Sequence, residues 1–165
     1  MLRWTLPCLL VVVLAGCDMY DIKVNERVVF SPRPIFTDFE TGDTALRACL
    51  EQAIADGNVT AAAELTTLNC SHAGIADLAG IATFTGLRQL KLSANQIRNL
   101  VEVARLTQLQ ILYLDDNQVV DPVPLYDLPA LHTLDLSDNP DLQCPAPGAL
   151  VKLEDLILPK HCTAR

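Results

Sequence analysis

The sequence has little of several residue types that would point to a particular chemistry. Aromatic residues make up only 5% of the 165 residues, so any core must be built from leucine, isoleucine, valine and alanine. Lysine and arginine number 12 against 20 acidic residues, and the net charge is -8. Because contacts to phosphate need clustered cations, this balance argues against nucleic acid as a partner.

Patterns typical of enzymes are also missing. The sequence has no phosphate-binding glycine loop and no paired-carboxylate motif. The best catalytic arrangement is Ser71-His72 with Asp77, but adjacent residues on a strand point to opposite sides. No CxxC pair occurs, and His72 and His161 lie far apart, so a zinc site is poorly supported. We therefore expect a chain that is not an enzyme and has no cofactor, metal or small-molecule substrate.

A short apolar run opens the sequence. It spans residues 5–13, follows Arg3 and leads directly into Leu14-Ala15-Gly16-Cys17. The run is too short for a membrane span, which needs about 20 residues, and is typical of a signal peptide. The last four residues resemble the lipobox of bacterial lipoproteins. That resemblance implies cleavage of residues 1–16, acylation of Cys17 and a lipid anchor in the cell envelope; a secretory signal that merely precedes a cysteine is the alternative.

Residues 17–42 are predicted to form the lipidated N-terminus and a tether. They lack sustained periodicity and contain Ser31-Pro32-Arg33-Pro34, which favours extended geometry. Large apolar residues at 28–30 and at Phe36 and Phe39 indicate that part of the segment packs against the folded domain. Asp18 resembles a signal that keeps enteric lipoproteins in the inner membrane, but other bacteria read different positions, so the choice of membrane stays open.

A helix is predicted over residues 43–56. Thr41 or Asp43 can cap its start, and Gly57 would end it. Its apolar stripe has helical spacing and consists of Leu46, Cys49, Leu50, Ala53 and Ile54. Because a repeat array exposes an apolar end unless something covers it, we expect residues 43–64 to be a capping helix and its lead-in.

Residues 65–165 repeat with a period of 22. Five similar segments begin at Leu65, Leu87, Leu109, Leu131 and Leu153. Each unit continues to a fixed later position, occupied by Ala73, Asn95, Asn117, Asn139 and His161. This pattern resembles the leucine-rich repeat, and the short unit is similar to the internalin and SDS22-type class.

The resemblance implies an α/β solenoid, a right-handed superhelix with a concave parallel β-sheet. The Leu-x-Leu part of each unit would be a strand with its leucines inward, and the asparagine ladder of Asn95, Asn117 and Asn139 would satisfy backbone groups where the chain turns. A 22-residue unit leaves little room for a convex helix, so short 3₁₀ or extended segments are expected, and Pro122 and Pro124 fit them. In the fourth unit Leu142 comes one place late, which predicts a change of shape.

Four cysteines lie outside the predicted leader and lipidation site. Cys49 is on the apolar face of the predicted helix, and Cys70 takes an inward strand position. Two pairs follow, Cys49–Cys70 and Cys144–Cys162. Each closes a loop of about 20 residues, worth roughly 3 kcal/mol by the loop-entropy model, and would fix one end of the stack. Four free, buried thiols are the alternative.

The outward strand residues would form columns on the concave sheet. In leucine-rich-repeat proteins, which this chain resembles, that sheet is the usual binding face. Ile111 and Tyr113 are expected to be exposed at the centre of the array, beside several acids. The predicted partner-binding residues are Gln89, Lys91, Ile111, Tyr113, Asp115, Asp116, Asp135 and Asp138. An aromatic anchor rimmed by acids is typical of a hot spot for a basic or amphipathic protein. A solvated face with one tolerated tyrosine is the alternative, and calcium is disfavoured because no compact acidic loop occurs.

The sequence thus predicts a non-enzymatic protein-interaction module, anchored by lipid to the bacterial cell envelope. A surface-displayed adhesion or host-interaction protein, or a structural envelope protein, is the alternative.

Overall fold

The computed structural model of the chain describes residues 22–24, 27–30 and 34–163. The predicted signal peptide and the predicted lipidation site at Cys17 lie outside these residues. The chain falls into two units, Met1–Pro34 and Ile35–Arg165. The first contains an antiparallel hairpin of β1 (Ile22–Val24) and β2 (Arg27–Phe30), an element that the sequence did not predict.

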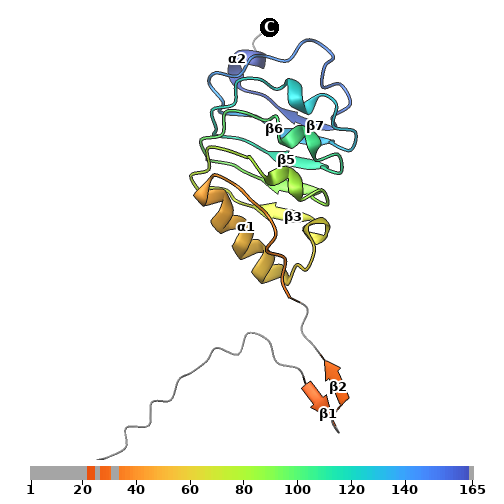
Figure 1. The fold of residues 1–165 in the computed structure, drawn as a ribbon. Coiled ribbons are helices and arrows are strands. Elements are labelled where there is room, and N and C mark those ends of the chain that lie inside the picture. The colour runs from red at the N-terminus through yellow and green to blue at the C-terminus, as the bar shows by residue number, and fades with distance from the viewer. Residues whose placement is uncertain (1–21, 25–26, 31–33, 164–165) are drawn as a thin grey trace, which may run out of the picture. The chain divides into compact units, whose positions relative to one another are not determined.

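The second unit is a solenoid whose strands form one parallel sheet (Figure 1). The strands are β3 (Thr67–Asn69), β4 (Gln89–Lys91), β5 (Ile111–Tyr113), β6 (Thr133–Asp135) and β7 (Asp155–Ile157). They pair in chain order, and each strand residue pairs with the residue one 22-residue period later. The predicted fold class is therefore confirmed.

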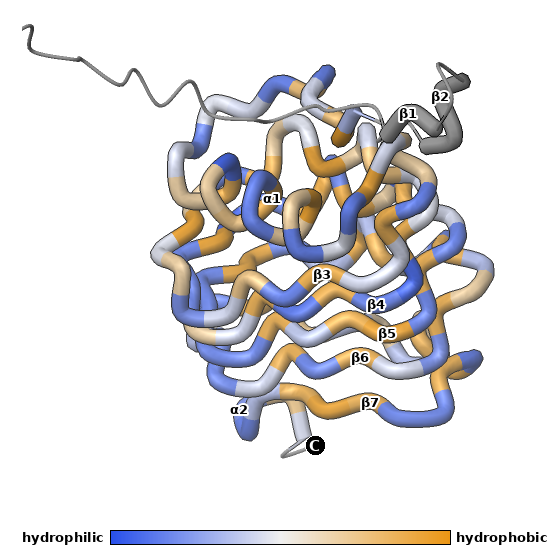
Figure 2. The backbone as a smooth tube through the Cα atoms, turned by 90° about the horizontal axis from the view of Figure 1, so that it is seen from below, coloured by the Kyte–Doolittle hydropathy of each residue, from blue (hydrophilic) through white to orange (hydrophobic). Residues whose placement is uncertain are grey.

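The core runs through the stack as rows of aliphatic side chains. The central leucines of β3, β4, β5 and β6 are at most 1% exposed: Leu68, Leu90, Leu112 and Leu134. Figure 2 shows apolar and polar positions recurring in the same place on successive strands. The exception is Leu156 of β7, which is 37% exposed. It was expected to point inward like the others. β7 lies at one edge of the sheet, as β3 does at the other, but β3 is contacted by the helix at residues 44–57.

The return segments after β3, β4 and β5 contain 3₁₀ turns, as predicted for a unit of this length, and a further 3₁₀ turn precedes β3. These turns are η1 (Ala62–Glu64), η2 (Ile81–Thr83), η3 (Val103–Arg105) and η4 (Val123–Leu125). Pro122 is the N-cap of η4, and Pro124 lies inside it. Among the helices of the described residues, none has both the length and the apolar character that a membrane span requires.

Three buried asparagines connect neighbouring repeats. The side-chain oxygen of Asn95 accepts a hydrogen bond from the Ile75 N–H (3.0 Å), and its amide nitrogen donates to the carbonyls of Cys70 and Leu92. Asn117 and Asn139 repeat this pattern one and two turns later. Each amide therefore satisfies backbone groups that the turn leaves unpaired.

The fourth repeat changes shape for an identifiable reason. In the preceding repeats, Gln96 and Gln118 donate their backbone N–H groups to Ile75 and Ile97. The equivalent residue of the fourth repeat is Pro140, which has no N–H. The contact shifts to Gln143, which donates to Val120 (2.8 Å).

Helix α1 (Thr44–Gly57) closes the N-terminal end of the stack. It buries Leu46, Leu50 and Ile54, as the apolar stripe predicts. The prediction that Gly57 ends the helix is wrong by one residue: Gly57 is its last residue, and Asn58 is the C-cap in the left-handed conformation (φ 47°). Asparagine adopts this conformation more readily than most residues because its short polar side chain can hydrogen-bond locally.

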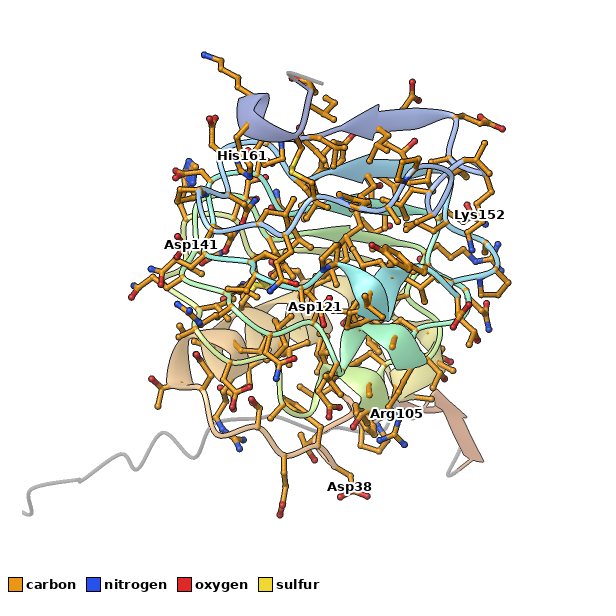
Figure 3. The ribbon with its side chains drawn as sticks, turned by 90° about the horizontal axis from the view of Figure 1, so that it is seen from above. Asp38, Arg105, Asp121, Asp141, Lys152 and His161 are labelled. Carbon is orange, nitrogen blue, oxygen red and sulfur yellow. A yellow bond between two sulfur atoms is a disulfide. The ribbon has the colours of Figure 1, made fainter. Side chains whose placement is uncertain are left out.

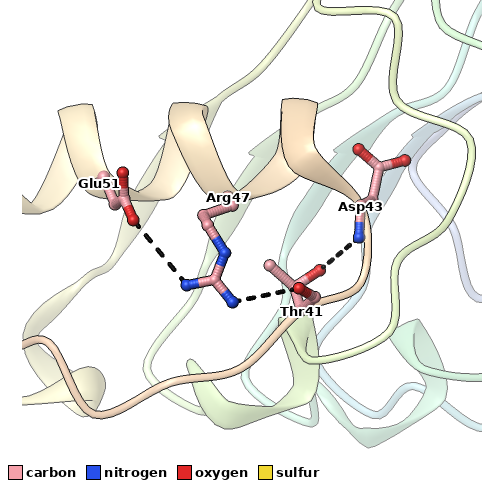
Figure 4. A network of polar contacts seen from close by, with 4 residues as sticks. All are labelled: Thr41, Asp43, Arg47 and Glu51. Carbon is pink, nitrogen blue, oxygen red and sulfur yellow. Dashed lines mark hydrogen bonds and ion pairs between the residues drawn. The ribbon is translucent and has the colours of Figure 1, made fainter.

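Asp43 fastens α1 to the first repeat. One oxygen of its carboxylate accepts from the Ala45 and Leu46 N–H groups, and the other accepts from Ala76 and Asp77 at 2.8 and 3.0 Å. Burial acts to raise the pKa of Asp43, but the four donors outweigh it and hold the pKa below the ordinary value. Figure 4 shows the adjoining contacts of Thr41, Asp43, Arg47 and Glu51.

Residues before α1 cover the same end. The Phe36 N–H donates to the Val59 carbonyl (2.8 Å), and the rings of Phe36 and Phe39 pack against Phe84 with centroids 6.0 and 5.4 Å away. The prediction that part of this segment packs on the domain is confirmed for these two residues.

The cysteines are joined in the two expected pairs, Cys49–Cys70 and Cys144–Cys162. The Cys49–Cys70 disulfide links α1 to the residue that directly follows β3. The second links the fourth repeat to α2 (Lys160–Thr163), a four-residue helix that contains no buried residue.

Candidate functional site

The concave face of the sheet is built by the first and third residue of each strand. Because side chains alternate along a strand, these residues face away from the core when the central leucine is buried. The parallel register then aligns them in two columns. One column is Thr67, Gln89, Ile111, Thr133 and Asp155, and the other is Asn69, Lys91, Tyr113, Asp135 and Ile157.

A row of tight turns borders the columns. His72, Ala94, Asp116 and Asp138 have positive φ values of 60°, 55°, 54° and 53°, so the chain turns sharply at the same point of four repeats. Asp116 and Asp138 are exposed at these turns, whereas Asp115 and Asp135 are half-buried closer to the strands. The predicted acids therefore lie at two levels, two against the sheet and two at its rim.

The expectation that Ile111 and Tyr113 are exposed is wrong, because both are half-buried. A column neighbour covers Tyr113: the Lys91 ammonium lies 5.5 Å from the centre of its ring, a contact that attracts the cation to the ring face. The exposed apolar side chains lie nearer the C-terminal end, where Ile157 is 53% exposed.

The acids of this face form hydrogen bonds to small polar residues. Asp115 accepts from the Ser93 hydroxyl (2.6 Å), and Asp135 accepts from the hydroxyl and the N–H of Ser137. Among the described residues these acids form no ion pair, in contrast to Glu51, which lies 3.9 Å from Arg47. Within the described ranges, their negative charge is therefore balanced by hydrogen bonds and not by a cation.

A hollow of about 410 Å³ lies at the C-terminal half of this face. It is lined by Tyr113, Thr133, Leu134, Asp135, Glu154, Asp155, Leu156 and Ile157. The lining combines an aromatic ring, exposed aliphatic side chains and three carboxylates. Such a surface fits a partner that carries both apolar groups and positive charge.

The hollow brings together only two of the predicted binding residues, Tyr113 and Asp135. Gln89, Lys91 and Ile111 lie on β4 and β5 beyond it. Sequence reasoning left Asp155 and Ile157 out of the site although their columns were known. The available signal was their place in the two columns, one 22-residue period after Thr133 and Asp135.

The best catalytic arrangement in the sequence does not assemble. The Asp77 carboxylate accepts from the Ala79 N–H (3.0 Å), and its own N–H donates to Asp43. His72 is exposed in its turn. These contacts give Asp77 and His72 local structural roles and do not join them into a base and its orienting acid.

Two similar solved structures are internalins. Internalin C2 of Listeria monocytogenes is 27% identical and superposes with a TM-score of 0.61 over 69% of this chain and 53% of that chain. The repeats are leucine-rich repeats. Internalin InlF of the same bacterium shares the fold at 22% identity and a TM-score of 0.51, over 69% of this chain and 42% of its own.

The chain therefore spans about half the length of these internalins or less. The sequence matches no family model, and no curated protein is significantly similar to it. The likeness establishes a leucine-rich-repeat protein.

Proposed function

We propose that this leucine-rich-repeat protein is a non-enzymatic binding module that takes a protein partner on the C-terminal half of its concave face. The observation that carries the proposal is the hollow beside Tyr113, where Ile157 is exposed and three carboxylates have no ion pair within the described part of the chain. Apolar groups exposed beside carboxylates without an ion pair are typical of a surface that binds a partner, and a surface that only contacts water does not need them.

The lining favours a basic, amphipathic partner. Tyr113 is flanked by Lys91 on one side and Asp135 on the other in its column. A lysine or arginine of the partner that enters on the Asp135 side would reach that carboxylate and those of Glu154 and Asp155, while its apolar neighbours cover Leu156 and Ile157. The remaining predicted residues, Gln89, Lys91, Ile111, Asp115, Asp116 and Asp138, would extend the contact toward the N-terminal half.

Site-specific photocrosslinking tests this placement. A photoreactive amino acid at Ile157 should crosslink a partner in intact cells, and one at Val101 should not. The two positions are matched, since their side chains are 53% and 58% exposed, but Val101 lies on the return segment before η3. Crosslinking at Val101 in place of Ile157 would contradict the concave site.

The anchoring is a separate part of the proposal. Residues 1–16 would be removed as a leader, Cys17 acylated, and residues 17–42 left as the segment between lipid and repeats. Support comes from the lipobox-like Leu14-Ala15-Gly16-Cys17. Since several acyl chains bind a membrane stably, Cys17→Ser should move the protein from the membrane fraction to the soluble fraction, and unchanged fractionation would reject the anchor.

The partner's location distinguishes envelope recruitment from surface display. Protease added to whole cells should leave the protein intact if it faces the periplasm. Cleavage under these conditions would favour an adhesion or host-interaction role for the same concave face.

A further inference from the structure

The two disulfides have different surroundings. In the Cys49–Cys70 pair, Cys70 is 2% exposed and belongs to the core. In the Cys144–Cys162 pair both residues are half-buried, and the adjacent His161 is exposed. Thiol–disulfide exchange needs access of a thiolate to a disulfide sulfur. Cys49 is half-buried as well, so the N-terminal pair has one partly accessible cysteine and the C-terminal pair has two.

Three metal-ligand side chains meet at the C-terminal pair. The sulfurs of Cys144 and Cys162 and a ring nitrogen of His161 lie within 4.8 Å of one another. Ligand atoms on one tetrahedral zinc ion are roughly 3.5–3.8 Å apart, given bonds of about 2.3 Å to sulfur and 2.0–2.1 Å to nitrogen. Among the described residues no other set of three such groups comes this close. His161 is the second residue of α2, and Figure 3 labels it there.

A hydrogen bond fixes the histidine in a form suited to a ligand. The Nε2 atom of His161 lies 2.9 Å from the Leu142 carbonyl oxygen. A carbonyl oxygen only accepts, so Nε2 carries a proton, and Nδ1 is the ring nitrogen left to offer a lone pair to a metal. Histidines that bind metals nearly always donate their other ring N–H in this way. Leu142 is 3% exposed, which holds the acceptor in place.

We propose that reduction of the Cys144–Cys162 disulfide opens a site for a zinc-class metal ion, bound by Cys144, Cys162 and His161. A dithiol reductant transfers two electrons and two protons to the disulfide and leaves as a disulfide itself. Zn²⁺ then displaces the two thiol protons and binds both thiolates and the Nδ1 lone pair. A hollow of about 400 Å³ borders His161, so water has access to the fourth position.

The exchange replaces one C-terminal crosslink by another. In the oxidised protein a covalent bond ties the fourth repeat to α2, and in the reduced protein the metal ion makes the same connection. The Cα atoms of the two cysteines are 5.2 Å apart, so the backbone needs no large movement. The site does not depend on the proposed concave-face function.

Cobalt binding to the full chain tests the site, with Cys8 and Cys17 changed to serine so that they add no thiols. The protein is reduced with a dithiol, which is removed anaerobically before Co²⁺ is added. The reduced protein should bind one Co²⁺ per chain with the absorption of tetrahedral thiolate coordination, and Zn²⁺ should displace it. The oxidised protein should bind none. Loss of an outer-shell partner typically weakens metal binding by about 10- to 100-fold. His161→Gln removes a ligand itself and should weaken binding by at least that much.

Two controls separate the site from a loss of folding. His161 is exposed, so His161→Gln should keep the far-ultraviolet circular dichroism of the parent. In the reduced parent chain, Zn²⁺ should protect Cys144 and Cys162 from alkylation and leave the labelling of Cys49 and Cys70 unchanged. Failure of the reduced protein to bind Co²⁺, equal affinity in His161→Gln, or protection of Cys49 and Cys70 instead would overturn the proposal.

Discussion

The two ends of the repeat stack differ in how completely their apolar side chains are covered. At the N-terminal end, α1 buries three side chains, Asp43 accepts four backbone hydrogen bonds, and Phe36 and Phe39 cover Phe84. At the C-terminal end, α2 buries none, and Val151, Leu156 and Ile157 are 84%, 37% and 53% exposed.

The difference shows that a disulfide and a cap contribute different things. Both ends have a disulfide, but a crosslink mainly limits the entropy of the unfolded chain and does not cover apolar surface. Among the described residues, an element that removes the last row of leucines from water is found at the N-terminal end alone. The C-terminal half of the sheet is therefore the part with apolar groups free for a partner.

The same substitution at each end should give the largest contrast. Leu50→Ala removes a side chain with no exposed surface and should lower the free energy of unfolding by about 3–5 kcal/mol, through lost burial and a cavity. Leu156→Ala should cost less than about 1 kcal/mol because that side chain is already partly in water. Urea denaturation measures both, and equal losses would show that β7 is as well covered as α1.

A second contrast is between Asn139 and His161, which occupies the same repeat position one period later. Asn139→Ala leaves the Leu114 and Leu136 carbonyls and the Val119 N–H without their partner, and should cost about 2–3 kcal/mol since buried groups lose hydrogen bonds. His161→Ala in the oxidised protein removes one contact to Leu142 from an exposed position and should cost about 1 kcal/mol or less. Chemical denaturation measures both losses of unfolding free energy. A larger loss for His161→Ala than for Asn139→Ala would contradict a stabilising role of the asparagine ladder.

Acid should weaken the N-terminal end through Asp43. Its pKa is lowered in the folded protein, so its contribution is complete above the ordinary value of 3.8 and is lost as pH falls through the lower folded pKa. Asp43→Ala should cost about 1–2 kcal/mol at neutral pH, as a lost N-cap does. The difference between parent and variant should shrink below pH 4 in denaturation series; a constant difference would rule out the carboxylate as its source.

The smallest effect is expected for Lys152, which donates to the carbonyls of Tyr126 and Leu128 at 2.7 and 2.9 Å. Lys152→Met keeps the length of the side chain and removes these bonds. It should lower global stability by less than about 1 kcal/mol, because the residue is exposed. Faster limited proteolysis near residues 145–151, compared with the parent protein, would report the local loosening.

The periodic part of the fold was predictable because its causes are local and repeated. The 22-residue spacing places every strand of the parallel sheet, the late Leu142 marks the altered fourth repeat, and the cysteine positions indicate both pairs. Exposure was predicted less well. Tyr113 was expected to be open, but Lys91 from the preceding strand stacks on it. Leu156 was expected to be covered, but it lies on an edge strand of the sheet, and α2 at that end buries no residue. Both depend on adjacent strands, which a residue's own position in the repeat does not specify.

Amide hydrogen exchange of the oxidised protein tests the contrast between the two ends most directly. Amides of β3 and β4 should exchange only through opening of most of the stack, whereas amides of β7 should exchange through local opening at a lower free energy. Protection that falls toward β7 while β3 remains as protected as β4 is the predicted result. Equal protection of β7 and β4, or a loss of protection that begins at β3, would contradict a stack closed at its N-terminal end and open at its C-terminal end.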